Sequence, residues 1–146
     1  MLSQNVIKDV VIIGGGLSGV CSAIAAARHG VSVALIQDRP VLGGNSSSEV
    51  RVWACGAGVG FNRFAEETGI IGELSMENLY SNQHGNPHIW DSILLDFVLK
   101  ESNLELFLNT HVFSVTTHEN VIESITAINI GSEKMISFSA KIFIDC

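Results

Sequence analysis

The feature that most constrains the fold is a short apolar run that ends in a glycine-rich turn and continues into an alanine-rich segment. Val10 to Ile13 is uninterrupted and rich in β-branched residues, which is typical of a strand buried on both faces. Apolar side chains then recur at helical spacing from Leu17 to Arg28, and Gly30 stands where a glycine commonly ends a helix. The pattern therefore predicts a strand, a tight turn and a helix in immediate succession.

The turn itself fits G-x-G-x-x-G, with Gly14, Gly16 and Gly19 at the glycine positions. Such glycines allow a tight turn, close backbone approach to a pyrophosphate, and close packing of helix on strand. The pyrophosphate would bind the free N–H groups at the helix N-terminus, where about half a positive charge is concentrated. A second apolar run, 31–36, ends in Gln37-Asp38, roughly 20 residues downstream, where such units place a ribose-binding acid. These features predict a dinucleotide-binding βαβ unit in an α/β fold with a Rossmann-like parallel sheet.

A second glycine-containing loop follows the second predicted strand. Pro40 and the pair Gly43-Gly44 prevent a strand or helix from continuing through this segment. The loop would lie at the carboxyl edge of the sheet, where open α/β sheets bind ligands. Its backbone could close over a cofactor from the side opposite the first turn, or it could be an ordinary surface loop.

Composition bounds the class of protein. The 146 residues are 47% hydrophobic, which gives room for one domain with a true core. The net charge is −7 and the eight basic residues are scattered, which argues against nucleic acid or an anionic membrane as a partner. Residues 1–8 lack the apolar region of a secretory signal, and no apolar run is long enough to span a membrane, so we expect a cytoplasmic protein.

Metal and disulfide chemistry are not indicated. Cys21, Cys55 and Cys146 are an odd number of cysteines at irregular spacing, which favours neither a disulfide framework nor a zinc site. His84 and His88 have the spacing of two ligands on one helical face, but Pro87 fits better as the first helical residue after an Asn86 N-cap. His84 then lies outside the helix, and we expect no metal site.

The second half of the chain changes from helical to extended patterns. The segment 87–101 predicts an amphipathic helix whose apolar stripe holds Trp90 as a core residue; the other members are Ile89, Ile93, Leu94, Phe97 and Val98. A strand at 104–108 follows. The runs 112–117, 121–130 and 135–138 then predict three antiparallel strands in a meander, and Ile142 to Ile144 predicts a further, buried parallel strand. An NAD dehydrogenase domain would more often continue with alternating helices and strands.

Together, these motifs resemble the N-terminal part of FAD-dependent oxidoreductases with the glutathione-reductase-like flavoprotein fold. The resemblance rests on Gly14-x-Gly16-x-x-Gly19, the strand end at 37–40, Leu42 to Ser47, and Glu49 to Arg51, and it extends from about Asp9 to the last residue. It implies an FAD-binding domain over residues 1–146 that contains the β-meander at 112–139. It also implies that the chain is the front part of a longer protein, because the family's last strand runs into a Thr-Gly-Asp segment that would follow Cys146.

The resemblance also implies which residues bind the cofactor. The pyrophosphate would contact Gly14, Gly16, Leu17 and Ser18, with Gly19 completing the motif. The adenosine would contact Gln37, Asp38 and Arg39, with the backbone of Val112 beside the adenine, and the ribityl chain would follow Gly43, Gly44 and Asn45. The family's usual ribose-binding Glu is Gln37 here, so the ribose partner is open between Gln37 and Asp38.

The predicted function is hydride or electron transfer between FAD and a small-molecule substrate, which leaves the catalytic side chains unassigned. Residues 49–86 are expected to form an irregular and helical insertion on the substrate side, with a helical pattern from Phe64 to Tyr80 broken at Gly69 and Gly72. Weak catalytic candidates are Arg51, Cys55 and His88. Cys55 lacks a C-x4-C partner, which excludes dithiol chemistry; it is either a thiol beside substrate or flavin, or a small buried hydrophobe. The alternatives are an NAD(P)-dependent dehydrogenase and a non-catalytic binding module of the same fold.

Overall fold

The computed structural model describes residues 3–55, 65 and 67–146. In chain order the elements are β1 (Ser3–Ile13), α1 (Leu17–Arg28), β2 (Val33–Ile36), the 3-10 turn η1 (Gly44–Ser46), α2 (Gly69–Ser81), α3 (Pro87–Leu99), β3 (Leu104–Phe107), β4 (Thr110–His118), β5 (Val121–Asn129) and β6 (Lys134–Asp145). The strands form one sheet in the order β3-β2-β1-β6-β5-β4. β3, β2, β1 and β6 are parallel neighbours, whereas β5 is antiparallel to β6 and β4. The predicted α/β class, with a parallel sheet and an antiparallel meander, is confirmed.

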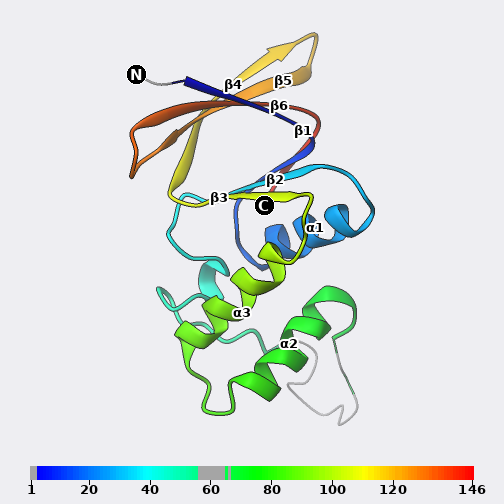
Figure 1. Ribbon diagram of the computed structural model, residues 1–146, viewed down its shortest axis with the longest axis vertical. Helices are drawn as coiled ribbons and strands as arrows, with labels where there is room; N and C mark the ends of the chain where they lie inside the picture. Colours follow the sequence, from blue (N-terminus) through cyan, green and yellow to red (C-terminus); the bar gives the residue numbers. More distant parts are fainter. Residues whose placement is uncertain (1–2, 56–64, 66) are drawn as a thin grey trace.

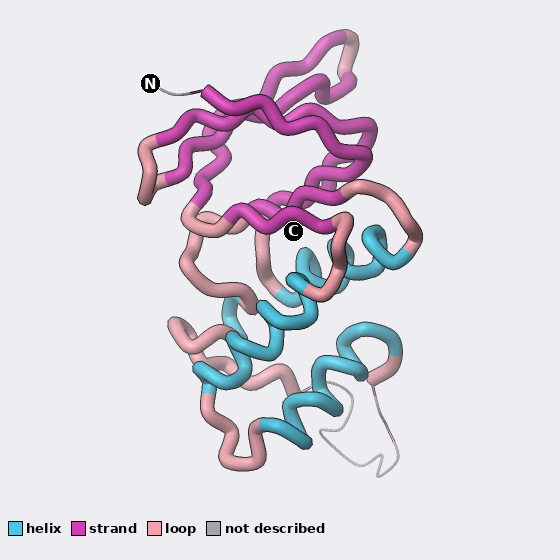
Figure 2. Tube along the Cα trace, viewed as in Figure 1, coloured by secondary structure: helices cyan, strands magenta, loops and turns pink. Residues whose placement is uncertain are grey.

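The sheet bends so that it carries a separate apolar core on each face (Figure 1). On one face, α1 and α3 pack over β1, β2 and β3, around Ile12, Leu35 and Leu94. On the other face, the meander folds back over the parallel strands and encloses Val11, Ile36 and Phe138 (Figure 2). The Phe138 ring meets that of Phe107 edge to face, with 4.9 Å between centroids. Helices and meander therefore cover opposite faces and leave the carboxyl edge of the parallel strands for loops.

The first and last strands are longer than their apolar runs predict. β1 begins at Ser3 because its first half pairs with β6, starting from Ser3 opposite Met135. The expected third strand of the meander and the expected separate strand at Ile142 to Ile144 are one continuous strand, β6. The prediction that this last segment is buried is also wrong, because Ile142 is 56% exposed. Pairing between distant segments, rather than local hydrophobicity, sets these lengths.

Both predicted helices that contact the sheet are confirmed. Gly30 has φ +86° and its N–H donates to the Ala27 carbonyl at 2.8 Å, which ends α1 where the sequence predicts. At the start of α3, the Asn86 side chain accepts a hydrogen bond from the N–H of His88, with Pro87 as the first helical residue. The α3 stripe is buried at Trp90, Ile93, Leu94 and Val98, whereas Ile89 is 38% exposed and lies at its margin.

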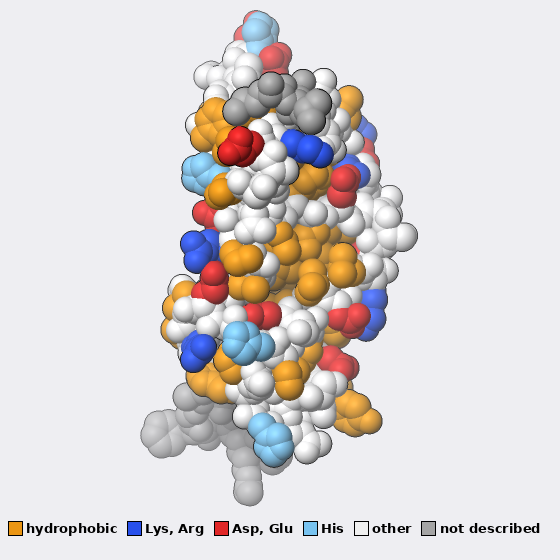
Figure 3. Space-filling view, turned by 60° about the vertical axis from the view of Figure 1, so that its left-hand side comes forward, with side chains coloured by type: hydrophobic (Ala, Val, Ile, Leu, Met, Phe, Trp, Pro, Cys, Tyr) orange, Lys and Arg blue, Asp and Glu red, His pale blue; other side chains and the backbone are white. Residues whose placement is uncertain are grey.

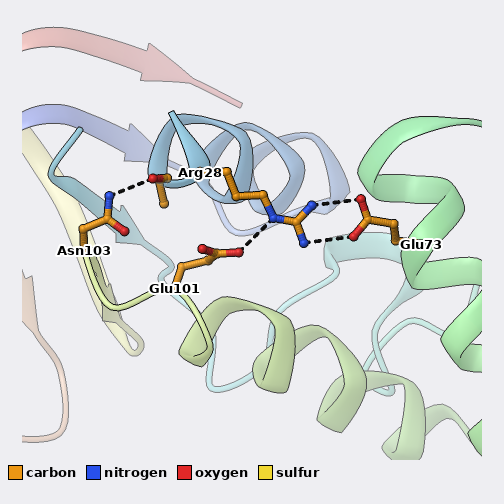
Figure 4. Close-up of polar contacts among 5 residues, drawn as sticks. Arg28, Glu73, Glu101 and Asn103 are labelled. Atoms are coloured by element: carbon orange, nitrogen blue, oxygen red, sulfur yellow. Dashed lines mark hydrogen bonds and ion pairs between the residues drawn. The ribbon is translucent and has the colours of Figure 1, made fainter. Parts of the chain in front are cut away.

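The helix α2 is attached to α1 by a network around Arg28 (Figure 4). The guanidinium donates two parallel hydrogen bonds to the Glu73 carboxylate, at 2.8 and 2.9 Å, and a third to Glu101 at 2.9 Å. The hydrogen bonds from Arg28 lower the pKa of Glu73.

α2 runs through Gly72, so the predicted interruption there is wrong, whereas the predicted start near Phe64 lies outside the described residues. Among the described residues, no helix combines the length and the apolarity that a bilayer crossing needs.

The core makes a direct stability prediction. Leu94 is fully buried between α3 and the sheet, whereas Leu99 at the end of the same helix is 64% exposed. Leu94→Ala is expected to lower the free energy of unfolding by about 2–5 kcal/mol, because it removes buried methyl groups and leaves a cavity. Leu99→Ala, the matched control, should change it by less than about 0.5 kcal/mol. Urea unfolding followed by circular dichroism measures both, and equal losses would contradict the assignment of the core.

A carboxylate between three strands predicts a pH dependence. Asp9 accepts hydrogen bonds from Lys141 Nζ at 2.8 Å and from the N–H and hydroxyl of Ser32 at 3.0 and 2.7 Å. These contacts, led by that of Lys141, lower the pKa of Asp9 below its ordinary value of 3.8. The resulting stabilisation is present above the unfolded pKa and is lost as the pH falls through the folded pKa.

Asp9→Asn should therefore be less stable than the unaltered chain at pH 7. The difference should shrink as the pH falls from the ordinary pKa of 3.8 towards the lower folded pKa, because the unfolded chain takes up the proton before the native carboxylate does. Denaturant unfolding at a series of pH values measures this. A difference that does not depend on pH would show that the charge of Asp9 is not what stabilises the junction.

Candidate functional site

A cavity of about 530 Å³ lies at the carboxyl edge of the parallel strands, where the sequence predicts the ligand. It brings together eight of the predicted cofactor residues: Gly14, Gly16, Gln37, Asp38, Arg39, Gly44, Asn45 and Val112. Leu17, Ser18 and Gly19, in the first turn of α1, and Gly43, in the second glycine loop, do not line it. The geometry thus gathers segments from β1, β2, β4 and the second glycine loop at one edge of the sheet.

Two glycines of the first turn are required by the protein's own packing. A Cβ on Gly19 would lie 1.8 Å from the Gly14 carbonyl oxygen, so only glycine lets α1 pack this closely on the turn. Gly14 has φ +103°, and a Cβ there would lie 2.2 Å from the carbonyl oxygen of Cys146 at the end of the last strand. These two positions join β1, α1 and the end of β6.

Gly16 differs from both, because a Cβ at this position would meet no heavy atom of the described residues within 4 Å outside its own helix and chain neighbours. Its φ of −66° and ψ of 179° are open to any residue. It caps α1, in which Val20 is the first residue to donate a helical hydrogen bond, to the Gly16 carbonyl at 2.9 Å. The N–H groups of Leu17, Ser18 and Gly19 precede that bond and receive no side-chain cap within the described chain. Open space beside uncapped amides is the arrangement that accepts an anionic group.

The second glycine loop packs against the first. The Gly43 N–H donates to the Gly15 carbonyl at 2.8 Å, and Gly43 and Gly16 form a parallel β-bridge. A Cβ on Gly44 would lie 3.2 Å from the Cα of Gly16. The loop is anchored by Leu42, which is 2% exposed, and by Ser46, whose hydroxyl accepts a hydrogen bond from the Trp90 indole at 3.0 Å. It is therefore a built part of the site rather than a detached surface loop.

The three residues after β2 have different environments. Gln37 is 6% exposed and bonds inward, its Oε1 accepting from the Gly15 N–H and its Nε2 donating to the Val41 carbonyl, both at 3.1 Å. Arg39 donates two hydrogen bonds to Glu49, at 2.8 and 2.9 Å, which raises the pKa of Arg39 and lowers that of Glu49. Asp38 is exposed at the cavity, with its Oδ2 3.9 Å from His111 Nδ1. Asp38 thus presents an accessible carboxylate at the cavity.

Sequence reasoning missed several residues that line this cavity: Thr110, His111, Asp145 and Cys146. Asp145 and Cys146 reach it because β6 runs parallel to β1, with Ile13 opposite Asp145, and ends at the same edge. Thr110 reaches it through the short turn after β3, where its N–H donates to the Gln37 carbonyl at 2.9 Å. The rule that parallel strands end at one edge of a sheet could have identified Asp145 and Cys146, whereas nothing in the local sequence marks Thr110 or His111.

A second, larger cavity of about 1170 Å³ lies between the segment 51–55, α2 and α3. Leu17, at the start of α1, and Ser46, at the end of η1, also line it, and its apolar wall includes Val52, Trp53, Ile71, Met76, Leu79 and Trp90. Arg51 and Cys55 also line it, but His88 does not.

Cys55 is exposed, so its interpretation as a small buried hydrophobe is wrong. Trp90 is 8% exposed and belongs to the core, as predicted. Within the insertion expected at 49–86, residues 51–55 follow an irregular path, whereas 56–64 and 66 lie outside the described residues.

Charged side chains do not gather on the face shown in Figure 3. Acidic and basic groups are interspersed there, and hydrophobic side chains collect near the middle of the visible face. On this face, the described residues thus show the scatter of basic residues that the sequence predicts.

Known proteins share this architecture. L-proline dehydrogenase from P. horikoshii superposes with a TM-score of 0.57 at 19% identity, covering 99% of this chain and 23% of that one. Adenylylsulfate reductase from Archaeoglobus fulgidus gives a TM-score of 0.63 at 15% identity, covering 99% of this chain and 31% of that one. Such identities show the fold alone.

A curated protein, the soluble pyridine nucleotide transhydrogenase of Marinobacter nauticus, is 54% identical over 37 residues, which are 25% of this chain and 8% of that protein. The chain thus spans less than a third of each of these relatives. The family described as FAD dependent oxidoreductase matches residues 9–146. With the two glycine loops, the parallel sheet and the inserted meander in the expected order, this match shows that the chain belongs to the FAD-dependent oxidoreductase family.

Proposed function

We propose that this chain holds FAD in an extended form, with its ADP half in the smaller cavity and its flavin towards the larger one. The observation that carries the proposal is the open space beside Gly16, next to uncapped amides at the start of α1. A glycine that neither the backbone angles nor the described neighbours require is well explained by a pyrophosphate that needs the room.

The amides of Leu17, Ser18 and Gly19 would hold the pyrophosphate through hydrogen bonds and the positive end of the α1 dipole. Asp38 would accept hydrogen bonds from the ribose hydroxyls, because both polar atoms of the Gln37 side chain already bond within the protein. Arg39, held by Glu49, and the backbone of Val112 would flank the adenine. In this assignment the Asp38 carboxylate accepts hydrogen bonds from the ribose, and the backbone amides at the start of α1 donate hydrogen bonds to the phosphates.

The flavin side follows from how the cavities meet. Gly43, Gly44 and Asn45 would follow the ribityl chain. Gly43 pairs with Gly16, and the residues that follow Gly16 and Asn45, Leu17 and Ser46, line the larger cavity. FAD would supply hydride or electron transfer there, while the protein orients the ring and excludes water. The whole protein would act on a small-molecule substrate beside the apolar wall, with Arg51 and Cys55 near it. His88 lies away from both cavities and is not proposed as a catalytic residue.

The visible absorption spectrum of the purified full-length protein tests the cofactor. We expect a bound flavin that dithionite reduces. A suitable substrate should either reduce the oxidised flavin or reoxidise the reduced flavin. A colourless protein that takes up no FAD but binds NADH would favour a nicotinamide-dependent enzyme instead. A bound flavin that no donor reduces would indicate a non-catalytic module.

The Gly16 assignment is tested by a pair of variants. Gly16→Val should abolish FAD binding with little change in stability, because the added side chain fills only the space proposed for the pyrophosphate. Gly19→Ala, the control, should cost at least about 1–3 kcal/mol of folding free energy, because its Cβ collides with the Gly14 carbonyl. Flavin content and thermal unfolding are measured for both, and a Gly16→Val protein with full flavin content would overturn the placement.

The ribose assignment is tested at Asp38. Asp38→Ala should weaken FAD binding by about 10- to 100-fold, the value of hydrogen bonds to a charged acceptor. Glu133→Ala, which removes an exposed carboxylate at the turn before β6, should leave the affinity unchanged. Fluorescence titration of the flavin-free protein measures both, and an unchanged affinity in Asp38→Ala would remove Asp38 from the site.

A further inference from the structure

We infer that Gln37 is a positioning residue that holds both glycine loops in their cofactor-binding conformation through the two ends of its side-chain amide. The inference rests on the proposed function and extends it. Gln37 stands at the family's usual ribose-binding position, but we infer that it does not contact the ribose and instead positions the two loops of the same site.

The backbone of Gln37 is held by two hydrogen bonds to neighbouring strands. Its N–H donates to the Phe107 carbonyl and its carbonyl accepts from the Thr110 N–H, both at 2.9 Å, which extends the β2–β3 pairing beyond the strand ends. The side chain is 6% exposed and turns towards the first glycine loop. A side chain that starts from so rigid a backbone can hold its partners at a defined place.

Each end of the amide contacts a different loop. Oε1 accepts from the Gly15 N–H at 3.1 Å, and Nε2 donates to the Val41 carbonyl at 3.1 Å. The Gly15 carbonyl accepts from the Gly43 N–H at 2.8 Å, so both backbone polar groups of Gly15 are held. The next residue is Gly16, whose open side is the proposed place of the pyrophosphate. Gln37 thus fixes the peptide that leads into that place.

Packing around Gly15 is matched to this side chain. A Cβ on Gly15 would lie 2.9 Å from the Cβ of Gln37 and 2.7 Å from a methyl carbon of Leu42. Gly15 stands at a position that the G-x-G-x-x-G pattern leaves free, and its lack of a side chain is explained by the contact with Gln37 and Leu42. The glycine between the two motif glycines and the glutamine after β2 therefore form one unit.

The chemistry requires an amide at position 37. The site presents a donor, the Gly15 N–H, and an acceptor, the Val41 carbonyl, and an amide satisfies both at once. An ionised carboxylate has only acceptor oxygens and would place one of them against the Val41 carbonyl. A protonated carboxyl group would regain a donor. Asp38, one position later and exposed at the cavity, leaves Gln37 free for this role.

The test uses Gln37→Glu and Gln37→Met in the full-length protein, with FAD affinity measured by fluorescence from pH 5 to pH 8. Gln37→Met keeps the length but loses both hydrogen bonds, and should weaken FAD binding by about 5- to 100-fold at every pH. Gln37→Glu should be weakened similarly at pH 8 and should recover towards pH 5, because burial raises the pKa of the new carboxyl group and its protonated form donates. Gln83→Glu makes the same change at an exposed residue and should match the unaltered protein throughout.

Other titratable and charged groups face the same cavity: Asp38, Arg39, His111, Asp145 and Cys146. They are present in all four proteins, so only a pH dependence specific to Gln37→Glu supports the inference. A Gln37→Glu deficit that stays constant with pH, or an affinity equal to that of the unaltered protein at pH 8, would overturn it.

Hydrogen exchange of the flavin-free protein distinguishes this inference from the proposed function. The amide of Gly15 should exchange faster in Gln37→Met than in the unaltered protein, whether or not FAD binds. Equal protection in both proteins would falsify the positioning role even if FAD binding is confirmed. Lost protection in an unaltered fold that never binds FAD would instead support the role and refute the proposed cofactor site.

Discussion

The structure depends on the contact between two glycine loops at the carboxyl edge of one parallel sheet. The turn after β1 is held by α1 through the contact of Gly19 with Gly14, and by the second loop through the hydrogen bond from Gly43 to Gly15. Bare backbone lies against bare backbone because side chains at these positions would collide. The uncapped amides at the start of α1 are left facing the open side of Gly16, where backbone dipoles can bind an anionic group in a chain of net charge −7.

The remaining elements keep this contact in place from both faces of the sheet. α3 supplies Leu94 beneath Gly43 and Trp90 beside Ser46, so the second loop rests on a helix that belongs to the main core. The meander covers the opposite face and brings Thr110 and Val112 to the cavity. Arg28 joins α2 to α1 through Glu73, and α2 lines the larger cavity together with Leu17 at the start of α1. The two cavities are thus built around the same contact between the glycine loops.

Most elements, and eight of the residues that line the smaller cavity, could be predicted because their signals are local. The β-branched run before Gly14, the helical spacing after Gly16, the Asn86-Pro87 helix start and the short turns of the meander all depend on neighbouring residues. What failed were the bounds and burial of the first and last strands, which depend on pairing between distant segments. The first half of β1 and the continuity of β6 come from their mutual pairing along the strands, and Ile142 is apolar yet 56% exposed.

The sequence alone determined the order of strand, glycine turn and helix, the second glycine loop and the inserted meander, because short-range sterics and periodicity dictate them. Tertiary structure decided the different environments of Gln37 and Asp38, which are adjacent and both polar. Gln37 turns inward because Gly15 and Val41 offer a donor and an acceptor at its two ends, and Asp38 is left at the cavity. Those partners come from two separate loops, and only the folded sheet brings them within hydrogen-bonding distance of one side chain.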